Sequence, residues 1–218
     1  MANKDKNSMS LTEVISVKDP ESPKKAALIL KRGGVIVYPT ETLYGIGAFA
    51  SINDSVERIF DIKGRPHRKP IPILVRDIDM LSEIAEVTEL ALSLASRFWP
   101  GALTLILKQK ADLPELITCG TEKIAVRVSA NPFIQGLFEL INDPLTSTSA
   151  NISGGVNLTD LGELFETFNG KVDLIVDSGK IPESRGSTIV DLTLDTPQIL
   201  REGDINTNTL KEFIDGNS

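Results

Sequence analysis

The pattern of hydrophobic and polar positions divides the chain into short apolar runs and longer segments with helical periodicity. The apolar runs predict buried strands at residues 35–39, 71–75, 103–108, 123–128, 144–149, 172–176, 187–192 and 198–202. The periodic segments predict helices within residues 22–34, 53–65 and 88–101, and at residues 132–141, 160–168 and 207–215, with Gly64 as the exit of the second helix. Because helices alternate with apolar strands, the fold class is α/β, and one domain is the simplest interpretation.

The first predicted helix carries signals at both ends. We expect Ser22 to cap its N-terminus, Pro23 to occupy its first turn and Gly33 to end it. For the chain as a whole, we expect a flexible N-terminus over residues 1–15, one domain over residues 16–205, and a C-terminal helix and tail over residues 206–218.

Composition fits a cytoplasmic globular protein. The 218 residues are 41% hydrophobic and 24% charged, which are ordinary values. The single cysteine, Cys119, excludes an internal disulfide and a cysteine-based zinc cluster. The start of the sequence lacks the apolar stretch of a signal peptide, and no apolar run approaches the roughly 20 residues that span a membrane. We therefore expect a cytoplasmic location and no membrane partner.

Positive charge is concentrated in one short stretch of an otherwise acidic chain. The net charge is −7, which argues against broad, non-specific binding of nucleic acid. Yet the run KGRPHRKP, at residues 63–70, is rich in basic side chains and is stiffened by Pro66 and Pro70. An arginine can bind two phosphate oxygens in a fork, and a lysine acts as a mobile point charge. The run is therefore either a local phosphate site or a solvated charged loop.

Three other polar segments lie next to predicted strands. YPTETLYGIGAFA offers hydroxyls and glycines that allow close approach, or it is a plain turn. PLTSTSANISGG offers donors to an anion or a ribose, or it is a Ser/Thr-rich turn. The third is the pair RGSTIVDL and ILREG, which places Ser187 and Arg201 at strand ends.

The sequence lacks the motifs of two other kinds of site. Histidine pairs and HExxH are missing, so we expect no protein metal site. Ser149 lies outside a GxSxG motif, so we expect no serine-hydrolase triad.

A charged residue interrupts the predicted strand KIAVRV. Arg127 shares a strand face with Ala125, and a central strand of an α/β sheet is buried on both faces. A buried charge is costly unless it is paired. The partner of Arg127 is either an internal carboxylate or a bound substrate, and the residues alone leave both alternatives open.

Seven blocks in order give the sequence a resemblance to a known family. They are PTETLYGIGAFA, KGRPHRKPIPILV, WPGALTLIL, IAVRV, STSANISG, GSTIVDL and ILREG. With them, the chain closely resembles the YrdC/YciO-like family over about residues 20–203. The resemblance implies a fold of class α/β, a single-domain twisted mixed sheet flanked by helices with a concave, positively charged cleft. Longer relatives add a C-terminal domain, which we do not expect in this sequence.

The resemblance also implies an activity. Many family members are L-threonylcarbamoyl-AMP synthases, which make threonylcarbamoyl-adenylate and pyrophosphate from L-threonine, bicarbonate and ATP with Mg²⁺. A transient partner complex then transfers the threonylcarbamoyl group to tRNA, to which the synthase itself would make at most weak contact. By position, the residues implied for catalysis are Lys63 and Arg65, those implied for ATP binding are Lys63, Arg65, Lys69, Ser149, Asn157 and Arg201, and those implied for threonine binding are Thr42, Tyr44, Arg127, Ser147 and Ser187.

Two other functions stay open at this point. An RNA-binding or ribosome-associated module would use the same cleft, with a steep salt dependence and no release of pyrophosphate. The acidic net charge and the aromatic content of only 5% argue against it, because single-strand binders use aromatic stacking platforms. A YciO-like paralogue would keep the nucleotide site and use a different acceptor.

Overall fold

The computed structural model describes residues 11–216. Its helices are α1 (Ser22–Lys31), α2 (Asn53–Lys63), α3 (Ile78–Ile84), α4 (Glu89–Phe98), α5 (Glu115–Thr118), α6 (Pro132–Phe138), α7 (Leu161–Phe168) and α8 (Thr207–Asp215). Its strands are β1 (Glu13–Ser16), β2 (Ile36–Pro39), β3 (Tyr44–Gly47), β4 (Ile73–Leu74), β5 (Leu103–Lys108), β6 (Lys123–Arg127), β7 (Leu145–Thr146), β8 (Thr148–Ser149), β9 (Leu174–Asp177), β10 (Thr188–Asp191) and β11 (Gln198–Arg201).

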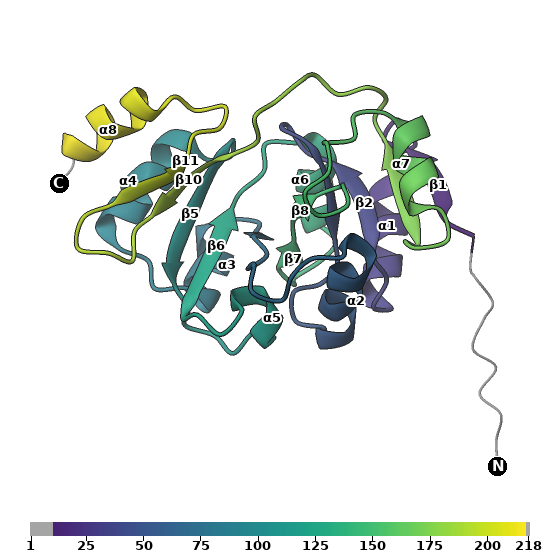
Figure 1. The fold of residues 1–218 in the computed structure, drawn as a ribbon, viewed down its shortest axis with the longest axis horizontal. Coiled ribbons are helices and arrows are strands. Elements are labelled where there is room, and N and C mark those ends of the chain that lie inside the picture. The colour runs from purple at the N-terminus through teal and green to yellow at the C-terminus, as the bar shows by residue number, and fades with distance from the viewer. Residues whose placement is uncertain (1–10, 217–218) are drawn as a thin grey trace, which may run out of the picture.

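The strands form two twisted mixed sheets rather than one. The first has the order β1-β9-β2-β3-β8 and the second the order β11-β10-β5-β6-β4-β7. Figure 1 shows α1, α2 and α7 around the first sheet, and α3, α4 and α8 around the second. The predicted α/β class with flanking helices is confirmed, and the single sheet is corrected to two.

The segment predicted as one strand, residues 144–149, is the reason for the division. Its first part, β7, pairs with β4 in the second sheet, and its last part, β8, pairs with β3 in the first. The Thr146 hydroxyl accepts a hydrogen bond from the backbone N–H of Ala48 at 2.9 Å, and Tyr38 Oη donates to the Thr146 carbonyl at 2.8 Å. The chain therefore crosses from one sheet to the other inside the core.

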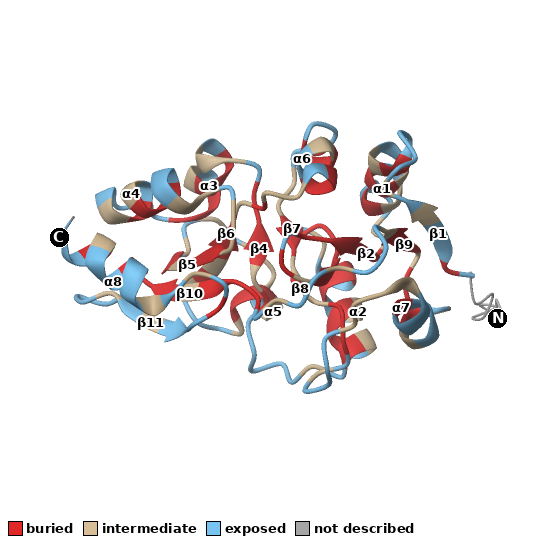
Figure 2. Cartoon of the chain, turned by 90° about the horizontal axis from the view of Figure 1, so that it is seen from above, coloured by how far each residue is buried: buried red, intermediate tan, exposed pale blue. Residues whose placement is uncertain are grey.

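Close backbone approach is needed at this crossing. A Cβ atom on Gly47 would clash with the carbonyl oxygen of Thr146, which only a glycine avoids. Buried side chains from both sheets belong to one hydrophobic cluster, which extends from Ala26 to Ile214. Figure 2 shows buried strands in the middle of the molecule and helices whose outer faces are exposed. The two sheets thus share one core.

Two expectations for the N-terminal part need correction. Within the stretch predicted to be flexible, β1 pairs in parallel with β9 from Glu13 to Ser16, and residues 1–10 lie outside the described residues. Ser22 is the first residue of α1 and not its cap. Its hydroxyl is buried and has no hydrogen-bond partner among the residues described. The cap position is taken by Glu21, whose side chain makes no capping bond.

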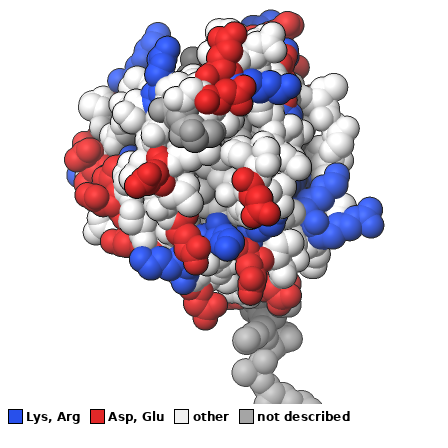
Figure 3. All heavy atoms as spheres, turned by 90° about the vertical axis from the view of Figure 1, so that its left-hand side faces the viewer, with Lys and Arg blue, Asp and Glu red and all other residues white. Residues whose placement is uncertain are grey.

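Within residues 11–216, every helix is too short or too polar to cross a membrane. On the face at the α8 end of the molecule, acidic and basic side chains are interspersed (Figure 3).

Candidate functional site

A cavity of about 440 Å³ lies between the two sheets, and both contribute to its lining. From the first sheet come residues at the β2–β3 turn and at β8. From the second come residues of β5, β6, β10 and β11, together with the basic loop after α2. The lining consists of Thr40, Thr42, Leu43, Tyr44, Gly45, Arg65, Pro70, Pro72, Thr104, Ile106, Ala125, Arg127, Ser147, Thr148, Ser149, Asn157, Arg185, Gly186, Ser187, Ile189 and Arg201.

Arginines and hydroxyls dominate the polar part of this lining. Four arginines take part, and none of the lining residues is acidic. Arg127 and Arg185 each have a carboxylate partner, Glu41 and Glu202. Arg65 and Arg201 have no carboxylate partner among residues 11–216. The cavity therefore combines compensated and uncompensated positive charge.

Arg65 is positioned by its own loop. Its Nε donates to the Lys69 carbonyl at 3.0 Å, and its Nη2 donates to the Pro70 carbonyl at 2.7 Å. Burial of the guanidinium lowers its pKa below the ordinary value. Two bonds to backbone carbonyls fix the plane of the guanidinium and leave further N–H groups for a ligand.

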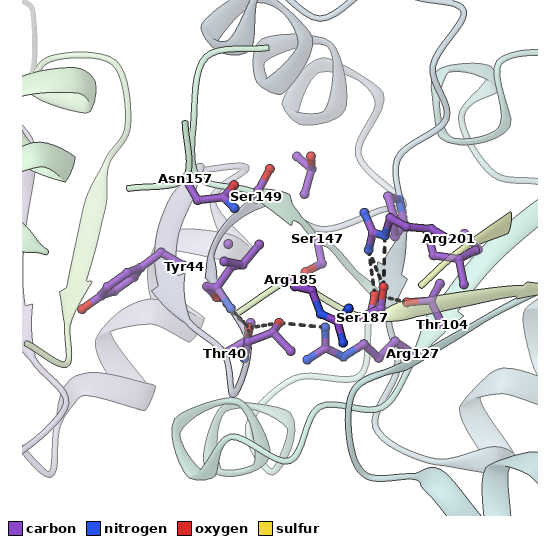
Figure 4. Close-up of a pocket in the computed structure, with 18 of the residues that line it drawn as sticks. Thr40, Tyr44, Thr104, Arg127, Ser147, Ser149, Asn157, Arg185, Ser187 and Arg201 are labelled. Atoms are coloured by element: carbon purple, nitrogen blue, oxygen red, sulfur yellow. Dashed lines mark hydrogen bonds between the residues drawn. The ribbon is translucent and has the colours of Figure 1, made fainter. Parts of the chain in front are cut away.

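Arg201 reaches the cavity from the end of β11. Its Nε and Nη2 donate to the Ser187 carbonyl at 3.1 and 2.7 Å, and Nη2 also donates to the Ser187 hydroxyl at 3.2 Å. That hydroxyl lies 2.7 Å from the hydroxyl of Thr104, which stands on β5 (Figure 4). Burial, and then repulsion from Arg127, lower the pKa of Arg201. An anion bound beside Arg201 would stabilise its charged form and so oppose both effects.

Arg127 has an internal partner, which answers the question left open by the sequence. Its Nη2 pairs with Glu41, its Nη1 donates to the Thr42 hydroxyl at 3.1 Å, and its Nε donates to the Gly101 carbonyl at 2.9 Å. The Arg127 side chain is 9% exposed, and that of Glu41 is 22% exposed. The internal carboxylate does not exclude a ligand, because Arg127 also lines the cavity.

Glu41 pairs with Arg127 and is not among the residues that line the cavity. Its second carboxylate oxygen accepts from the Ser129 hydroxyl at 2.5 Å. Burial opposes its ionisation, but Arg127 and the hydrogen bonds together hold the pKa of this carboxyl below its ordinary value. Glu41 belongs to the β2–β3 turn of the first sheet, and Arg127 ends β6 in the second. The ion pair therefore joins the two sheets beside the cavity.

Lys63 is placed differently from the sequence expectation. It is 1% exposed and does not line the cavity. Its Nζ donates to the carbonyls of Ser149 and Asn151 at 2.5 and 2.7 Å and to Asn151 Oδ1 at 2.9 Å. Burial and repulsion from Arg65 lower its pKa to about 7, whereas the three acceptors favour the ammonium form. Direct contact with a phosphate would require this ammonium to leave its acceptors.

Most of the other residues expected in the site line the cavity, and one does not. Ser149, Asn157 and Ser147 line the cavity, as do Thr42 and Tyr44, while Lys69 lies on the exposed part of the basic loop and does not. The Tyr44 hydroxyl is directed to Gly179, whose carbonyl accepts its hydrogen bond at 2.7 Å. The structure thus brings together all of the expected site residues except Lys63 and Lys69.

Three residues of this region were not among those expected. Thr104 is a single hydroxyl in the apolar strand LTLILK, and such an isolated polar residue in a buried strand was a usable signal. Arg185 immediately precedes the GSTIVDL block, but it stands in a loop whose path the sequence does not specify. The pairing of Glu41 with Arg127 depends on contact between two sheets, and one sequence carries no signal for it.

The comparison with known families identifies the chain's relatives. Residues 28–203 match the family model Sua5_yciO_yrdC, which is described as "Telomere recombination". The chain belongs to the Sua5/YciO/YrdC family. The resemblance found in the sequence blocks is thereby confirmed.

Two curated relatives and two solved structures illustrate the family. Threonylcarbamoyl-AMP synthase of Pyrococcus abyssi is 38% identical over 208 residues, which cover 94% of this chain and 61% of the relative. The uncharacterized protein YciO of Escherichia coli is 34% identical over 191 residues, which cover 84% of this chain and 92% of the relative. The structure of P. abyssi Sua5 with L-threonine is similar at a TM-score of 0.88, with 36% identity and coverage of 94% and 61%. For E. coli YciO the TM-score is 0.81, with 32% identity and coverage of 90% and 97%.

The lengths differ between these relatives. The chain spans about three-fifths of the length of the first synthases that it matches and nearly the whole of YciO. Family membership and fold follow from the comparison, and the activity is a separate question.

Proposed function

We propose that the chain is an L-threonylcarbamoyl-AMP synthase, a nucleotidyltransferase that uses ATP, L-threonine and bicarbonate. The observation that carries the proposal is that one cavity contains two uncompensated arginines, Arg65 and Arg201, and also Arg127, which is paired with Glu41 and donates to the Thr42 hydroxyl. The first suit a polyphosphate, and the second suits the carboxylate and hydroxyl of an amino acid. The relative whose solved structure contains L-threonine supports the second assignment.

The residues divide between the two substrates. In our proposal the ATP phosphates lie at Arg65 and Arg201, with Ser149 and Asn157 facing the nucleotide. Lys69 would reach the phosphates only from the exposed part of its loop. Lys63 would act through Ser149, whose carbonyl it binds. The proposed threonine site consists of Thr42, Tyr44, Arg127, Ser147 and Ser187.

The reaction needs position and charge more than a protein nucleophile. The threonine amine and bicarbonate would form a carbamate with loss of water. A carbamate oxygen would then attack the α-phosphorus, and the bond to the β-phosphate would break to release pyrophosphate. Phosphoryl chemistry of this kind depends mostly on positioning and charge neutralisation, which arginines supply. None of the lining residues is a histidine, aspartate or glutamate, so we propose that the substrates themselves carry the protons.

The lining does not provide a carboxylate ligand for Mg²⁺. Among the residues described, no group of three or more His, Cys, Asp or Glu side chains could hold a metal ion. Mg²⁺ often binds through phosphates and waters, and it neutralises phosphate charge when it is present. We therefore propose that the ion enters with ATP and takes its ligands mainly from the nucleotide.

A pyrophosphate-release assay tests the proposal. The protein is mixed with ATP, Mg²⁺ and bicarbonate, with and without L-threonine. We expect release that depends on L-threonine and on bicarbonate. Release that is absent, or that is the same without L-threonine, would contradict the proposal. The product would be consumed by a cytoplasmic complex that modifies tRNA, and we propose the same location for this protein.

A second candidate is a YciO-like paralogue with another acceptor. The observation that favours it is the similarity to E. coli YciO, which is 34% identical in sequence and superimposes at a TM-score of 0.81. The same assay separates the two, because a paralogue would release pyrophosphate with a different amine or without any. A panel of amino acids in place of L-threonine identifies the acceptor.

A further inference from the structure

The four arginines of the cavity differ in how their charge is balanced. Within residues 11–216, Arg65 and Arg201 bind backbone carbonyls and a hydroxyl but no carboxylate, so their positive charge is uncompensated there. Arg127 is paired with Glu41, and the side chains of both are mostly buried. Arg185 is paired with Glu202, but both side chains are well exposed and screened by water.

The pairing with Glu41 balances the charge of Arg127 at its end of the cavity. The carboxylate is held by Ser129 as well as by Arg127, so it cannot easily turn away. Arg127 keeps N–H groups beyond those used by Glu41, Thr42 and Gly101, because a guanidinium has five. A single carboxylate can therefore bind there, but a dianion would meet the negative charge of Glu41.

We infer that Glu41 is a specificity-determining residue, which compensates Arg127 so that this end of the cavity accepts a zwitterionic amino acid and rejects phosphate. The inference deepens the proposed function and rests on it. It explains how a cavity with four arginines can keep a polyphosphate away from its amino-acid end. Glu41 acts through Arg127 in this arrangement, because Glu41 itself is not among the residues that line the cavity.

Glu41→Gln is the direct test, because the amide keeps the shape and removes the charge. Glu21→Gln is the matched control. It removes the same charge from an exposed pair with Lys24 at the start of α1, and Glu21 does not line the cavity. The measurement is the dissociation constant of L-threonine by calorimetry, with and without inorganic phosphate. ATP affinity and melting temperature are measured on the same samples.

In the wild type and in Glu21→Gln, we expect phosphate to change L-threonine affinity little. In Glu41→Gln, phosphate should compete for Arg127 and weaken L-threonine affinity by about tenfold, because one nearby unit charge in a partly buried site has at least that effect. ATP affinity should stay nearly unchanged. If Glu41→Gln does not fold, Ser129→Ala loosens the same carboxylate and should shift phosphate competition in the same direction by a smaller factor.

The outcomes separate the inference from the proposed function. A wild type that does not bind L-threonine overturns the proposed function and the inference with it. A wild type that binds L-threonine, with Glu41→Gln and Ser129→Ala as insensitive to phosphate as Glu21→Gln, overturns the inference alone. A purely structural Glu41 would lower the melting temperature and weaken both ligands without creating phosphate competition, and this result also overturns it.

Discussion

Lys63 and Arg65 stand two positions apart and end in different environments. Arg65 lines the cavity from a loop, and its guanidinium is fixed by two carbonyls of that loop. Lys63 is inside the protein and holds the turn that follows β8. The sequence suggested one phosphate clamp for both residues. The structure instead gives Arg65 access to the cavity and gives Lys63 a structural position beneath it.

We expect Arg65→Ala to weaken ATP binding while leaving the fold intact. The residue lies outside the core, so few packing contacts are lost. Loss of a charged hydrogen bond to a phosphate should cost about 1.5–3 kcal/mol, or roughly tenfold to a hundredfold in affinity. Calorimetry with ATP and a melting curve measure the two quantities. An unchanged ATP affinity would mean that Arg65 does not bind the phosphates.

Lys63→Met should behave in the opposite way. The substitution keeps much of the volume but leaves the Ser149 and Asn151 carbonyls without their buried donor. We expect a loss of about 1–3 kcal/mol in the free energy of unfolding. Lys69→Met, on the exposed part of the loop that follows α2, is the control and should change stability little. Urea denaturation of both variants would refute this role for Lys63 if the two curves coincide.

The Glu41 carboxyl gives the fold a pH dependence with a definite sign. Its pKa is lowered in the folded protein, so the folded state binds fewer protons than the unfolded state around the ordinary value of 4.5. The stability that it contributes is present above about 4.5 and is lost as the pH falls through the lowered pKa. The stability difference between wild type and Glu41→Gln should therefore shrink in acid. Denaturation curves from pH 7 downward measure it, and a difference that grows in acid would contradict the assignment.

At the scale of elements, hydrophobic pattern and end signals located most helices and strands. The helix that ends at Gly64 is an example, because its glycine has a left-handed φ of 56° and the sequence marks it as the exit. The missed strand β3 contains Gly45 and Gly47, which are typical of a loop by composition. They are present because Gly47 lies against the Thr146 backbone, a contact that depends on tertiary structure. The same limit applies to the site. The sequence blocks that line it could be identified, but the change of sheet within residues 144–149 and the Glu41–Arg127 ion pair could not be predicted.

The crossing segment between the sheets gives a prediction of its own. Thr146→Val keeps the shape of a fully buried side chain but removes the hydroxyl that accepts from Ala48 N–H and donates to its carbonyl. We expect a loss of about 1–3 kcal/mol in stability, because those buried groups lose a partner. The exposed Thr196→Val is the matched control. Equal stability of the two variants would show that the crossing is not held by this hydroxyl.

At the scale of the whole molecule, the cavity exists only where the two sheets meet. Its lining comes from both, and the segment of residues 178–187 also runs from one sheet to the other (Figure 1). The two sheets are coupled because they share one core and because residues 144–149 contribute a strand to each. A ligand that contacts both sheets would therefore stabilise the molecule as a unit.

We expect the two halves to unfold together. Trp99 is the one tryptophan of the sequence and donates from its indole to the Leu103 carbonyl, so its fluorescence reports the second sheet. Far-UV circular dichroism reports both sheets and all helices. The two signals should give coincident urea transitions. Separate midpoints would show that the sheets are independent units.

The pairing of β1 with β9 has a consequence for how the protein is made. Glu13 pairs with Leu174, so a ribosome delivers the first strand long before its partner. Ser187 and Arg201, which complete the cavity, are delivered later still. Long-range parallel pairing is slow to form and leaves strand edges uncovered until it does. During synthesis, the growing chain must therefore avoid aggregation without help from a bound ligand, since the cavity is not complete until residue 201 has been added.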